Sequence, residues 1–227
     1  MRVLPLIVLV CCLSAHAQDS AIIIKAGTSF NESVSITDLY EYPQFVYGKV
    51  FFRPGDSSGG RLNYNRFLDQ MQFIDFKGDT LNIAYPGTIK FIRINNDLYY
   101  YDNGFVKLIK DNNTIKLAAK QTLRLSGKAK IGAYNMPSSS SAIDSYSSLV
   151  IDNKNYNLTP REDITLTKKT EYYFGDKYNH FVLANKKNIS RLYSKQDGAI
   201  TAYLKENNVD FNKREDIERL FQYLTNL

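Results

Sequence analysis

The stretch that decides the fold is YYYDNGFV, from Tyr99 to Val106. An Asn-Gly pair between two apolar-rich runs predicts a β-hairpin, because both central residues of a type I′ turn need φ > 0. From Phe45 to Leu125, further turn signals recur roughly every 8 to 12 residues, a spacing typical of an antiparallel meander. The sequence therefore predicts an α+β fold, with a mainly antiparallel β-sheet followed by a small C-terminal helical unit.

A glycine-rich run interrupts the strands upstream of this hairpin. Phe45–Phe52 is rich in β-branched and aromatic residues and predicts a strand. The run RPGDSSGG at residues 53–60 predicts a loop and, apart from one extra serine, resembles the nucleophile segment of chymotrypsin-like serine proteases. In that family the catalytic His precedes the serine, whereas the only histidine after His16 is His180. We therefore interpret residues 53–60 as a surface loop.

Downstream, the expected strands are short. Ile115 and Leu117, and then Leu123 and Leu125, end the main series. A Ser-rich stretch near residues 137–148 predicts a long loop. Beyond it the sequence predicts five short strands, at Leu149–Ile151, Tyr156–Leu158, Ile164–Thr167, Glu171–Phe174 and Phe181–Leu183.

The apolar period changes to that of a helix after Asn185. Asn185 is a candidate N-cap, and Asn212 is the candidate N-cap of the last helix. That helix carries an apolar stripe at i, i+3, i+4 and i+7, formed by Ile217, Leu220, Phe221 and Leu224. A helix of about 12 residues is marginal in water without packing. We therefore expect the stripe to pack on apolar strands near Ile74–Phe76 and Ile89–Ile94; the alternative is a tail that docks on another protein.

The first residues have the three parts of a secretory signal peptide. Arg2 is positively charged, residues 4–13 are mostly apolar, and Ala15-His16-Ala17 matches an A-x-A cleavage site. We expect a signal peptide at 1–17, a β-rich domain at 18–184 and a helical unit at 185–227. Cleavage would leave 227 − 17 = 210 residues, without either cysteine. Such a chain has no disulfide and no thiolate, and it would be periplasmic or extracellular.

The mature chain is basic. Without Arg2 it has 28 Lys and Arg against 23 Asp and Glu, a net charge of +5. Many of these cations, from Lys107 to Lys130, alternate along predicted strands and indicate a solvated sheet face. The alternative is a basic surface for an anionic lipid or glycan, including peripheral contact with a membrane. An exported protein rarely meets nucleic acid, so we expect no nucleic-acid partner, and no later apolar run predicts a transmembrane span.

Catalytic and cofactor motifs are weak. One histidine, His180, cannot form a multi-His metal site, and its interpretation as a general base with Asp176 competes with a plain hairpin edge. A carboxylate-dependent hydrolase needs two facing acids, for which Asp75, Asp79 and Asp163 are candidates beside turns. We find no P-loop, dinucleotide fingerprint or EF-hand loop, so no cofactor, metal or catalytic residue is predicted.

Tyrosines are the remaining candidates for binding. The chain has 17 Tyr, 13 Phe and no Trp. Tyr99-Tyr100-Tyr101 and Tyr172-Tyr173 place aromatic side chains on both faces of the expected sheet, where those on the solvent side can stack on sugar rings or anchor a partner. The sequence thus suggests Tyr99, Tyr101 and Tyr172 as binding residues; the alternative is that aromatic residues simply suit strands.

Two stretches carry a resemblance. FVYGKVFFRPGDSSGGRLNYNRFLDQMQFIDFKGDTLNIA, at residues 45–84, and ANKKNISRLYSKQDGAITAYLKENNVDFNKREDIERLFQYL, at residues 184–224, resemble uncharacterised exported β-rich proteins of Bacteroidetes-type Gram-negative bacteria. The resemblance implies a cell-envelope setting but no activity. We therefore expect a non-enzymatic binding or assembly protein whose partner is an envelope protein, a glycan or a lipid. The alternatives are a carrier of a lipid or acylated ligand in an apolar cavity and, third, a carboxylate-dependent hydrolase.

Overall fold

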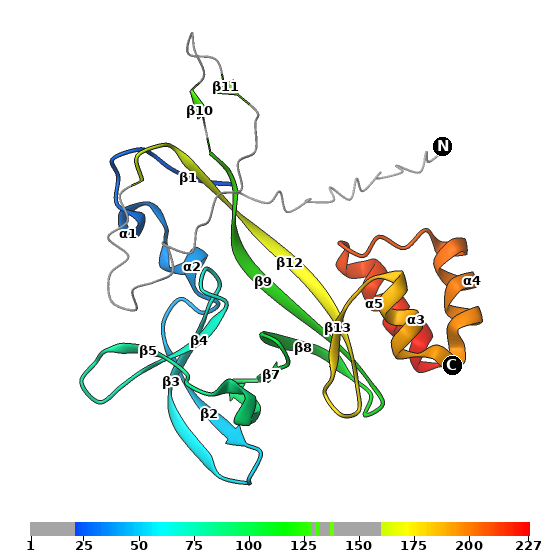
Figure 1. Ribbon diagram of the computed structural model, residues 1–227. Helices are drawn as coiled ribbons and strands as arrows, with labels where there is room; N and C mark the ends of the chain where they lie inside the picture. Colours follow the sequence, from blue (N-terminus) through cyan, green and yellow to red (C-terminus); the bar gives the residue numbers. More distant parts are fainter. Residues whose placement is uncertain (1–20, 129, 132–136, 139–159) are drawn as a thin grey trace, which may run out of the picture.

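The computed structural model describes residues 21–128, 130–131, 137–138 and 160–227. The expected signal peptide and the strands expected at 149–151 and 156–158 lie outside these residues. So does the Ser-rich stretch, apart from Pro137–Ser138. Within the described residues the fold class is confirmed, because a mainly antiparallel sheet is followed by a small helical unit (Figure 1).

In the part of the chain that the structure describes, eleven strands form one antiparallel sheet, and a separate pair lies apart from it. The order across the sheet is β1-β12-β9-β8-β7-β6-β2-β3-β4-β5, with β13 also paired to β12. Two meanders, β2 to β5 and β6 to β9, therefore join where β6 pairs with β2. The bounds are β1 Ile22–Ile24, β2 Val46–Phe52, β3 Ser57–Asn65, β4 Gln70–Ile74, β5 Thr80–Asn82, β6 Ile89–Ile94, β7 Asp97–Tyr101, β8 Phe105–Asp111, β9 Ile115–Lys128, β12 Ile164–Asp176 and β13 Phe181–Leu183, and the separate pair is β10 Lys130–Ile131 with β11 Pro137–Ser138.

A hairpin is present at Asn103-Gly104 as predicted, but its loop has 105 − 101 − 1 = 3 residues and is not the two-residue type I′ turn. β7 and β8 pair with Tyr101 opposite Phe105, and φ is 53° at Asn103 and 128° at Gly104. The loop predicted at 53–60 is only half right, because Ser57–Gly60 begins β3. These small side chains have little β propensity of their own, but the stretch is held as a strand by its pairing with the backbone of β2.

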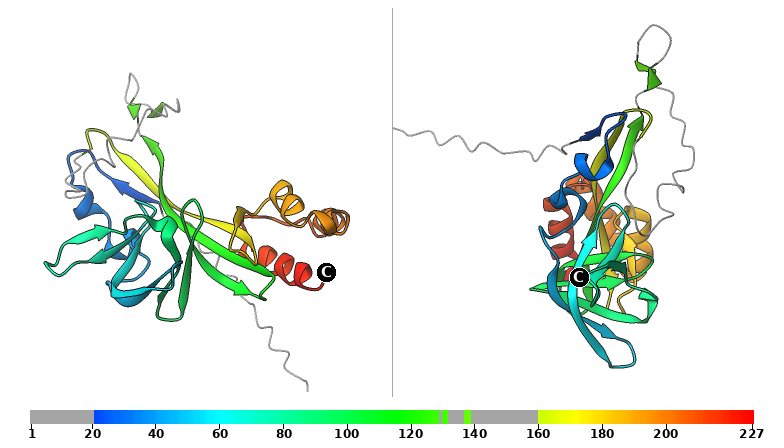
Figure 2. Two further views of the ribbon diagram at one scale, coloured as in Figure 1. Left: turned by 60° about the horizontal axis from the view of Figure 1, so that its bottom comes forward. Right: turned by 90° about the vertical axis from the view of Figure 1, so that its left-hand side faces the viewer.

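The sheet curls strongly between β9 and β3 (Figures 1 and 2). The N–H of Leu123 in β9 donates to the carbonyl of Arg66, just after β3, at 2.9 Å. This hydrogen bond brings β9 close to the end of β3. The strands between them in the sheet, β8, β7, β6 and β2, therefore curve around an apolar interior. The buried interior residues are Val50, Leu62, Tyr64, Met71, Ile89, Ile92, Ile94, Tyr99 and Phe105.

A long hairpin, β9 with β12, forms the spine of the molecule. It pairs continuously from Ile115 opposite Asp176 to Lys128 opposite Ile164, with one register shift. The expectation of separate short strands here is wrong. The polar residues in the middle of each strand suggested breaks, but they are paired in the ladder and their side chains meet partners from other elements.

The C-terminal unit packs on one end of this spine. It contains α3 Lys186–Leu192, the 3-10 turn η4 Ser194–Gln196, α4 Asp197–Asn207 and α5 Arg214–Thr225. The predicted stripe of α5 is buried against Leu117 and Phe174, and not against strands near Ile74–Phe76 or Ile89–Ile94. Phe76 is in fact 94% exposed. Asn185 caps α3 as predicted, whereas α5 begins only after Lys213, so Asn212 is not its cap.

Short helices cover the other end of the spine. They are α1 Phe30–Ser33 and α2 Ile36–Leu39, with the 3-10 turn η1 Pro86–Thr88 elsewhere, before β6. Phe30, Val34 and Leu39 pack with Leu123 and Leu166 in a second apolar cluster. The middle of the spine thus lies between two covered ends.

Candidate functional site

The inner face of the β9–β12 hairpin changes character along its length. Residues directly opposite in the ladder share a face, so Leu117 with Phe174 marks the end under the C-terminal helices. Gln121 with Thr170 follows toward the middle, and the Nε2 of Gln121 donates to the Oγ1 of Thr170 at 3.2 Å. The uncovered part of the face is therefore polar.

A cleft of about 510 Å³ opens over this polar segment. Its volume is within the range of about 300 to 1,000 Å³ that is usual for ligand sites. The C-terminal unit contributes Arg214, from the first turn of α5, and the curled part of the sheet contributes most of the remaining wall. The lining residues are Glu41, Tyr64, Arg66, Asp97, Tyr99, Phe105, Lys107, Leu108, Ile109, Ala119, Lys120, Gln121, Thr170, Tyr172 and Arg214.

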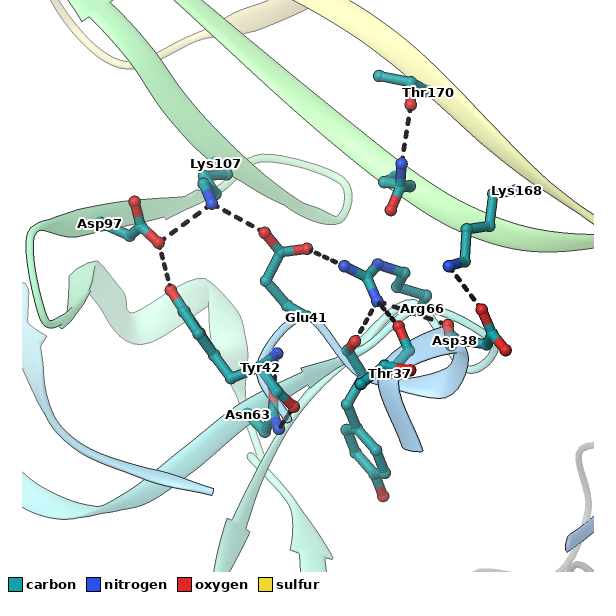
Figure 3. Close-up of polar contacts among 12 residues, drawn as sticks. Thr37, Asp38, Glu41, Tyr42, Asn63, Arg66, Asp97, Lys107, Lys168 and Thr170 are labelled. Carbon is teal, nitrogen blue, oxygen red and sulfur yellow. Dashed lines mark hydrogen bonds and ion pairs between the residues drawn. The ribbon is translucent and has the colours of Figure 1, made fainter. Parts of the chain in front are cut away.

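One wall of the cleft is a chain of ion pairs (Figure 3). Glu41 accepts from Arg66 Nη2 at 2.7 Å and from Lys107 Nζ at 2.8 Å. Lys107 reaches Asp97 as well, at 3.0 Å. Because each charge has an opposite charge beside it and the side chains are at least two-thirds buried, the wall is held in one arrangement.

Arg66 anchors this wall to the N-terminal segment. Its Nη1 donates to the carbonyls of Thr37, at 3.0 Å, and Tyr40, which are orphan acceptors at the C-terminal end of α2 (Figure 3). Arg66 is 7% exposed, and its Nε is a buried nitrogen with no hydrogen-bond partner among the residues that the structure describes. A cation is therefore fixed just behind the surface of the cleft, with one donor unused.

Tyrosine hydroxyls extend the same network. Tyr42 donates to Asp97 at 2.5 Å and lies 3.0 Å from the hydroxyl of Tyr99. Burial, and then the hydrogen bond to Asp97, raise the pKa of Tyr42 above its ordinary value. Burial likewise raises the pKa of Tyr99 well above 10.0. Both hydroxyls thus stay protonated at neutral pH and serve as hydrogen-bond donors.

A second ion pair supports the cleft from the inside of the curl. Lys120 Nζ lies 3.0 Å from Asp69, which also accepts from the hydroxyl of Tyr64 at 2.6 Å. The Lys120 side chain is only 7% exposed. Burial is the main cause that raises the pKa of Tyr64. The lysine is thus positioned by a carboxylate that does not itself line the cleft.

The structure places the three predicted tyrosines differently from one another. Tyr99 and Tyr172 line the cleft, but they are 2% and 7% exposed, so the expectation that they face solvent is wrong for both. Tyr99 belongs to the apolar interior of the curl, and Tyr172 belongs to the helix-covered end of the spine. Tyr101 is half-buried, packs edge-on against Phe105 at 5.0 Å and does not line the cleft. A binding role for these residues stays a prediction.

The other sequence candidates lie elsewhere. The Nδ1 of His180 pairs with Asp102 at 2.9 Å, not with the side chain of Asp176, on the exposed turn between β12 and β13. Asp75 accepts backbone N–H groups of its own turn, and Asp163 pairs with Lys25. The described residues contain no group of three or more His, Cys, Asp or Glu that could hold a metal ion.

The residues that form the wall carry no local signal in the sequence and were not predicted. Glu41 and Arg66 stand 25 positions apart, and Lys107 is 66 positions from Glu41, so no local spacing joins them. The one available signal was a polar interruption in the apolar alternation along one face of β9 and β12, at Gln121 and at Thr170. Such local conflicts with the strand pattern are expected at functional sites.

Comparison with known proteins gives no match. No family model, no curated protein and no solved structure is significantly similar to this chain. In the described part of the chain, no helix is both long and apolar enough to cross a membrane. The proposal below therefore depends on the geometry of the cleft and on the sequence.

Proposed function

We propose that the protein is an exported, non-enzymatic binding protein of the cell envelope that holds a polar, negatively charged ligand in the central cleft. Export follows from the signal-peptide pattern at residues 1–17. The observation that carries the choice of ligand is the charge of the lining, which has four cations, Arg66, Lys107, Lys120 and Arg214, against the carboxylates of Glu41 and Asp97.

Arg214 is the cation best placed to meet a ligand. Its Nε donates to Glu218 at 2.7 Å, and its side chain is 61% exposed. Its two terminal nitrogens make no hydrogen bond to the residues that the structure describes. A guanidinium presents these donors in a planar fork that matches a carboxylate or a phosphate. Arg214 therefore offers an anion its outer contact, whereas Arg66, Lys107 and Lys120 are each already paired with a carboxylate of the protein.

The floor and the walls favour a ligand that carries hydroxyl groups as well as charge. Gln121 and Thr170 offer amide and hydroxyl groups, and Tyr99 and Tyr172 line the same cleft. Sugar acids combine hydroxyls with carboxylates, so an acidic glycan suits this lining. It is also one of the partners that the sequence suggests for an envelope protein.

The two alternatives fit the same cleft less well. A lipid carrier needs a large apolar cavity, whereas the walls here are charged; the apolar hollow near β3 is about 210 Å³, below the usual size of a ligand site. A hydrolase needs two carboxyl groups free to act on the substrate. Here Glu41 and Asp97 both contact the ammonium group of Lys107, so their oxygens are engaged by the protein.

Titration calorimetry with the full mature chain tests the proposal. The probe is a galacturonic acid trisaccharide, and the neutral galactose trisaccharide is its matched control. We expect binding of the acid only, weakened by salt. Arg214→Gln should weaken it by about tenfold or more, because a charge-assisted contact is lost. Arg219→Gln, on the same helix but outside the cleft, is the control and should bind normally.

Three outcomes would contradict the proposal. If the neutral trisaccharide bound as tightly as the acidic one, charge would not determine which ligand the cleft binds. Binding of an acylated lipid in place of either sugar would favour the carrier. Cleavage of the trisaccharide, lost in Glu41→Gln or Asp97→Asn, would favour the hydrolase.

A further inference from the structure

The first half of β3 has an unpaired edge. Ser57–Gly60 pairs with β2 through contacts such as Val50 opposite Ser58 and Gly48 opposite Gly60. On its other side, β4 pairs only with Arg61–Asn65. No described strand lies beside Ser57–Gly60 on that side, and the β2–β3 hairpin lies at the bottom of Figure 1, with β6 paired only to its β2 side.

Alternation of the ladder shows which backbone groups face outward. Residues of an antiparallel pair exchange hydrogen bonds at every second position. Phe52 N–H donates to the carbonyl of Asp56 across the turn, so Ser58 and Gly60 direct their backbone groups toward β2. Ser57 and Gly59 therefore direct their N–H and C=O groups away from β2, toward the open side. A strand placed there would complete the ladder.

An apolar hollow of about 210 Å³ lies next to this edge. Its lining is Val50, Phe52, Ser58, Gly59, Gly60, Leu62, Phe73, Ile83 and Ala84. A Cβ added at Gly60 would meet no atom within 4 Å, so the hollow has room at that position. Side chains opposite Ser58 and Gly60 on an added strand would lie on this face. The hollow is small enough for one or two aliphatic side chains and too small for a lipid.

The other face of the same edge is basic. Lys49 lies opposite Gly59, and Arg61 follows Gly59 on the same face. Both are exposed, and neither has an ion pair among the described residues; Lys49 contacts only the ring of Phe51, at 5.3 Å. An acidic side chain opposite Gly59 on an added strand would therefore find Arg61 beside it and Lys49 within reach of its charge.

We propose that the open edge of β3 at Ser57–Gly60 is a docking site for an extended segment of a partner protein with alternating apolar and acidic side chains. The segment adds a strand by β-augmentation, in which main-chain hydrogen bonds provide affinity and alternate side chains provide specificity. Its apolar side chains enter the hollow, and its acidic side chains face Arg61 and Lys49. At Gly59 the missing Cβ leaves room for the hydroxyl of Tyr47, which would lie 2.3 Å from it, and at Gly60 the missing Cβ leaves the hollow open.

The test uses the full mature chain and a blocked pentapeptide, Glu-Val-Glu-Val-Glu. We expect the amide NMR signals of Ser57 and Gly59 to shift on binding and to become protected from hydrogen exchange. Gly60→Leu should weaken binding by about tenfold or more, because the leucine fills the hollow and a valine of the peptide is no longer buried. The control is Gly198→Leu in α4, another glycine with open space around it.

A second variant separates loss of the site from loss of the fold. Arg61→Glu leaves the hollow unchanged and should reverse the preference, so that Lys-Val-Lys-Val-Lys binds better than the acidic peptide. Wild-type protein that binds both peptides equally would overturn the proposal. So would unshifted signals at Ser57 and Gly59, or a Gly60→Leu variant that binds as the wild type does. Dimerisation of the chain through this edge, without peptide binding, would assign the edge to a second copy and would also overturn the proposal.

Discussion

The helix-covered end of the spine and the charged wall of the cleft are stabilised by different forces. At the covered end, Leu117 and Phe174 meet the apolar stripe of α5, and the stabilisation comes from apolar area removed from water. In the wall, Glu41 joins Arg66 and Lys107 through ion pairs. Apolar burial depends little on direction, whereas a half-buried charge depends on specific partners. The wall is thus the region where a ligand can be recognised, and the covered end is where the fold is secured.

The largest expected effect is at the covered end. Phe221→Ala should lower the free energy of unfolding by about 3–5 kcal/mol, because a large side chain is removed from a packed core. Urea unfolding followed by circular dichroism measures this change. Gln222→Ala, at the neighbouring exposed position, is the control. An unchanged unfolding midpoint for the β-rich part would mean that the helices fold independently of the sheet. The covered end would then not be the region that stabilises the fold.

A smaller effect is expected in the wall. Glu41→Ala should cost about 2–3 kcal/mol, because Arg66 and Lys107 lose the carboxylate between them and Arg66 stays buried. Chemical denaturation measures the change, with Glu32→Ala on the exposed side of α1 as the control. A loss below about 0.5 kcal/mol, the level of an ordinary surface substitution, would show that the wall contributes little to the fold.

The turn beside the cleft should give a still smaller change. Gly104→Val should cost about 1 kcal/mol or more, since a β-branched residue is strained at φ 128°. Its Cβ would also lie 2.3 Å from Lys120 Nζ, so the Lys120–Asp69 pair must shift. Gly55→Val, at φ 111° with open space around it, is a control for strain alone. An equal loss in both variants would show that Lys120 adjusts without difficulty.

The smallest expected effect is a difference in pH dependence. Burial acts to lower the pKa of Lys107, but the hydrogen bonds and charges of Glu41 and Asp97 outweigh it and raise this pKa above 10.5. Stability from these contacts is therefore present below about pH 10.5 and is lost as the pH rises through the raised value. Unfolding midpoints measured upward from about pH 9 should fall less steeply in Lys107→Gln than in the wild type. Lys110→Gln, which removes the exposed pair with Glu218 near the covered end, should keep the wild-type slope.

Local signals predicted the elements whose stability is local. Asn103-Gly104 identifies its hairpin because the turn itself demands φ > 0, and the stripe from Ile217 to Leu224 identifies α5 because one face of a helix must be buried. The long β9–β12 spine was not predicted, because Gln121 and Thr170 interrupt the apolar alternation. These two residues lie in strands because β9 and β12 pair with each other, and the two residues are 49 positions apart in the sequence.

Contacts between distant positions also explain why the open edge of β3 and the charged wall of the cleft were not predicted. Ser57–Gly60 has the composition of a loop, and only the neighbouring backbone of β2 makes it a strand. Glu41 and Arg66 carry no motif and meet because the segment after α2 runs antiparallel to the end of β3, where Tyr40 pairs with Asn65. Features built by tertiary contacts leave little trace in a single sequence.

The position of β1 has a consequence for the order of folding. Ile22 pairs with Leu166, so the two partners are separated by 166 − 22 = 144 positions along the chain. Contacts between such distant positions form late, because a long loop must close before they are gained. During synthesis, Ile22–Ile24 therefore leaves the ribosome long before its partner strand exists. Until β12 arrives, this apolar segment is an unsatisfied strand that a chaperone can hold, and its docking should be the slow final step of refolding.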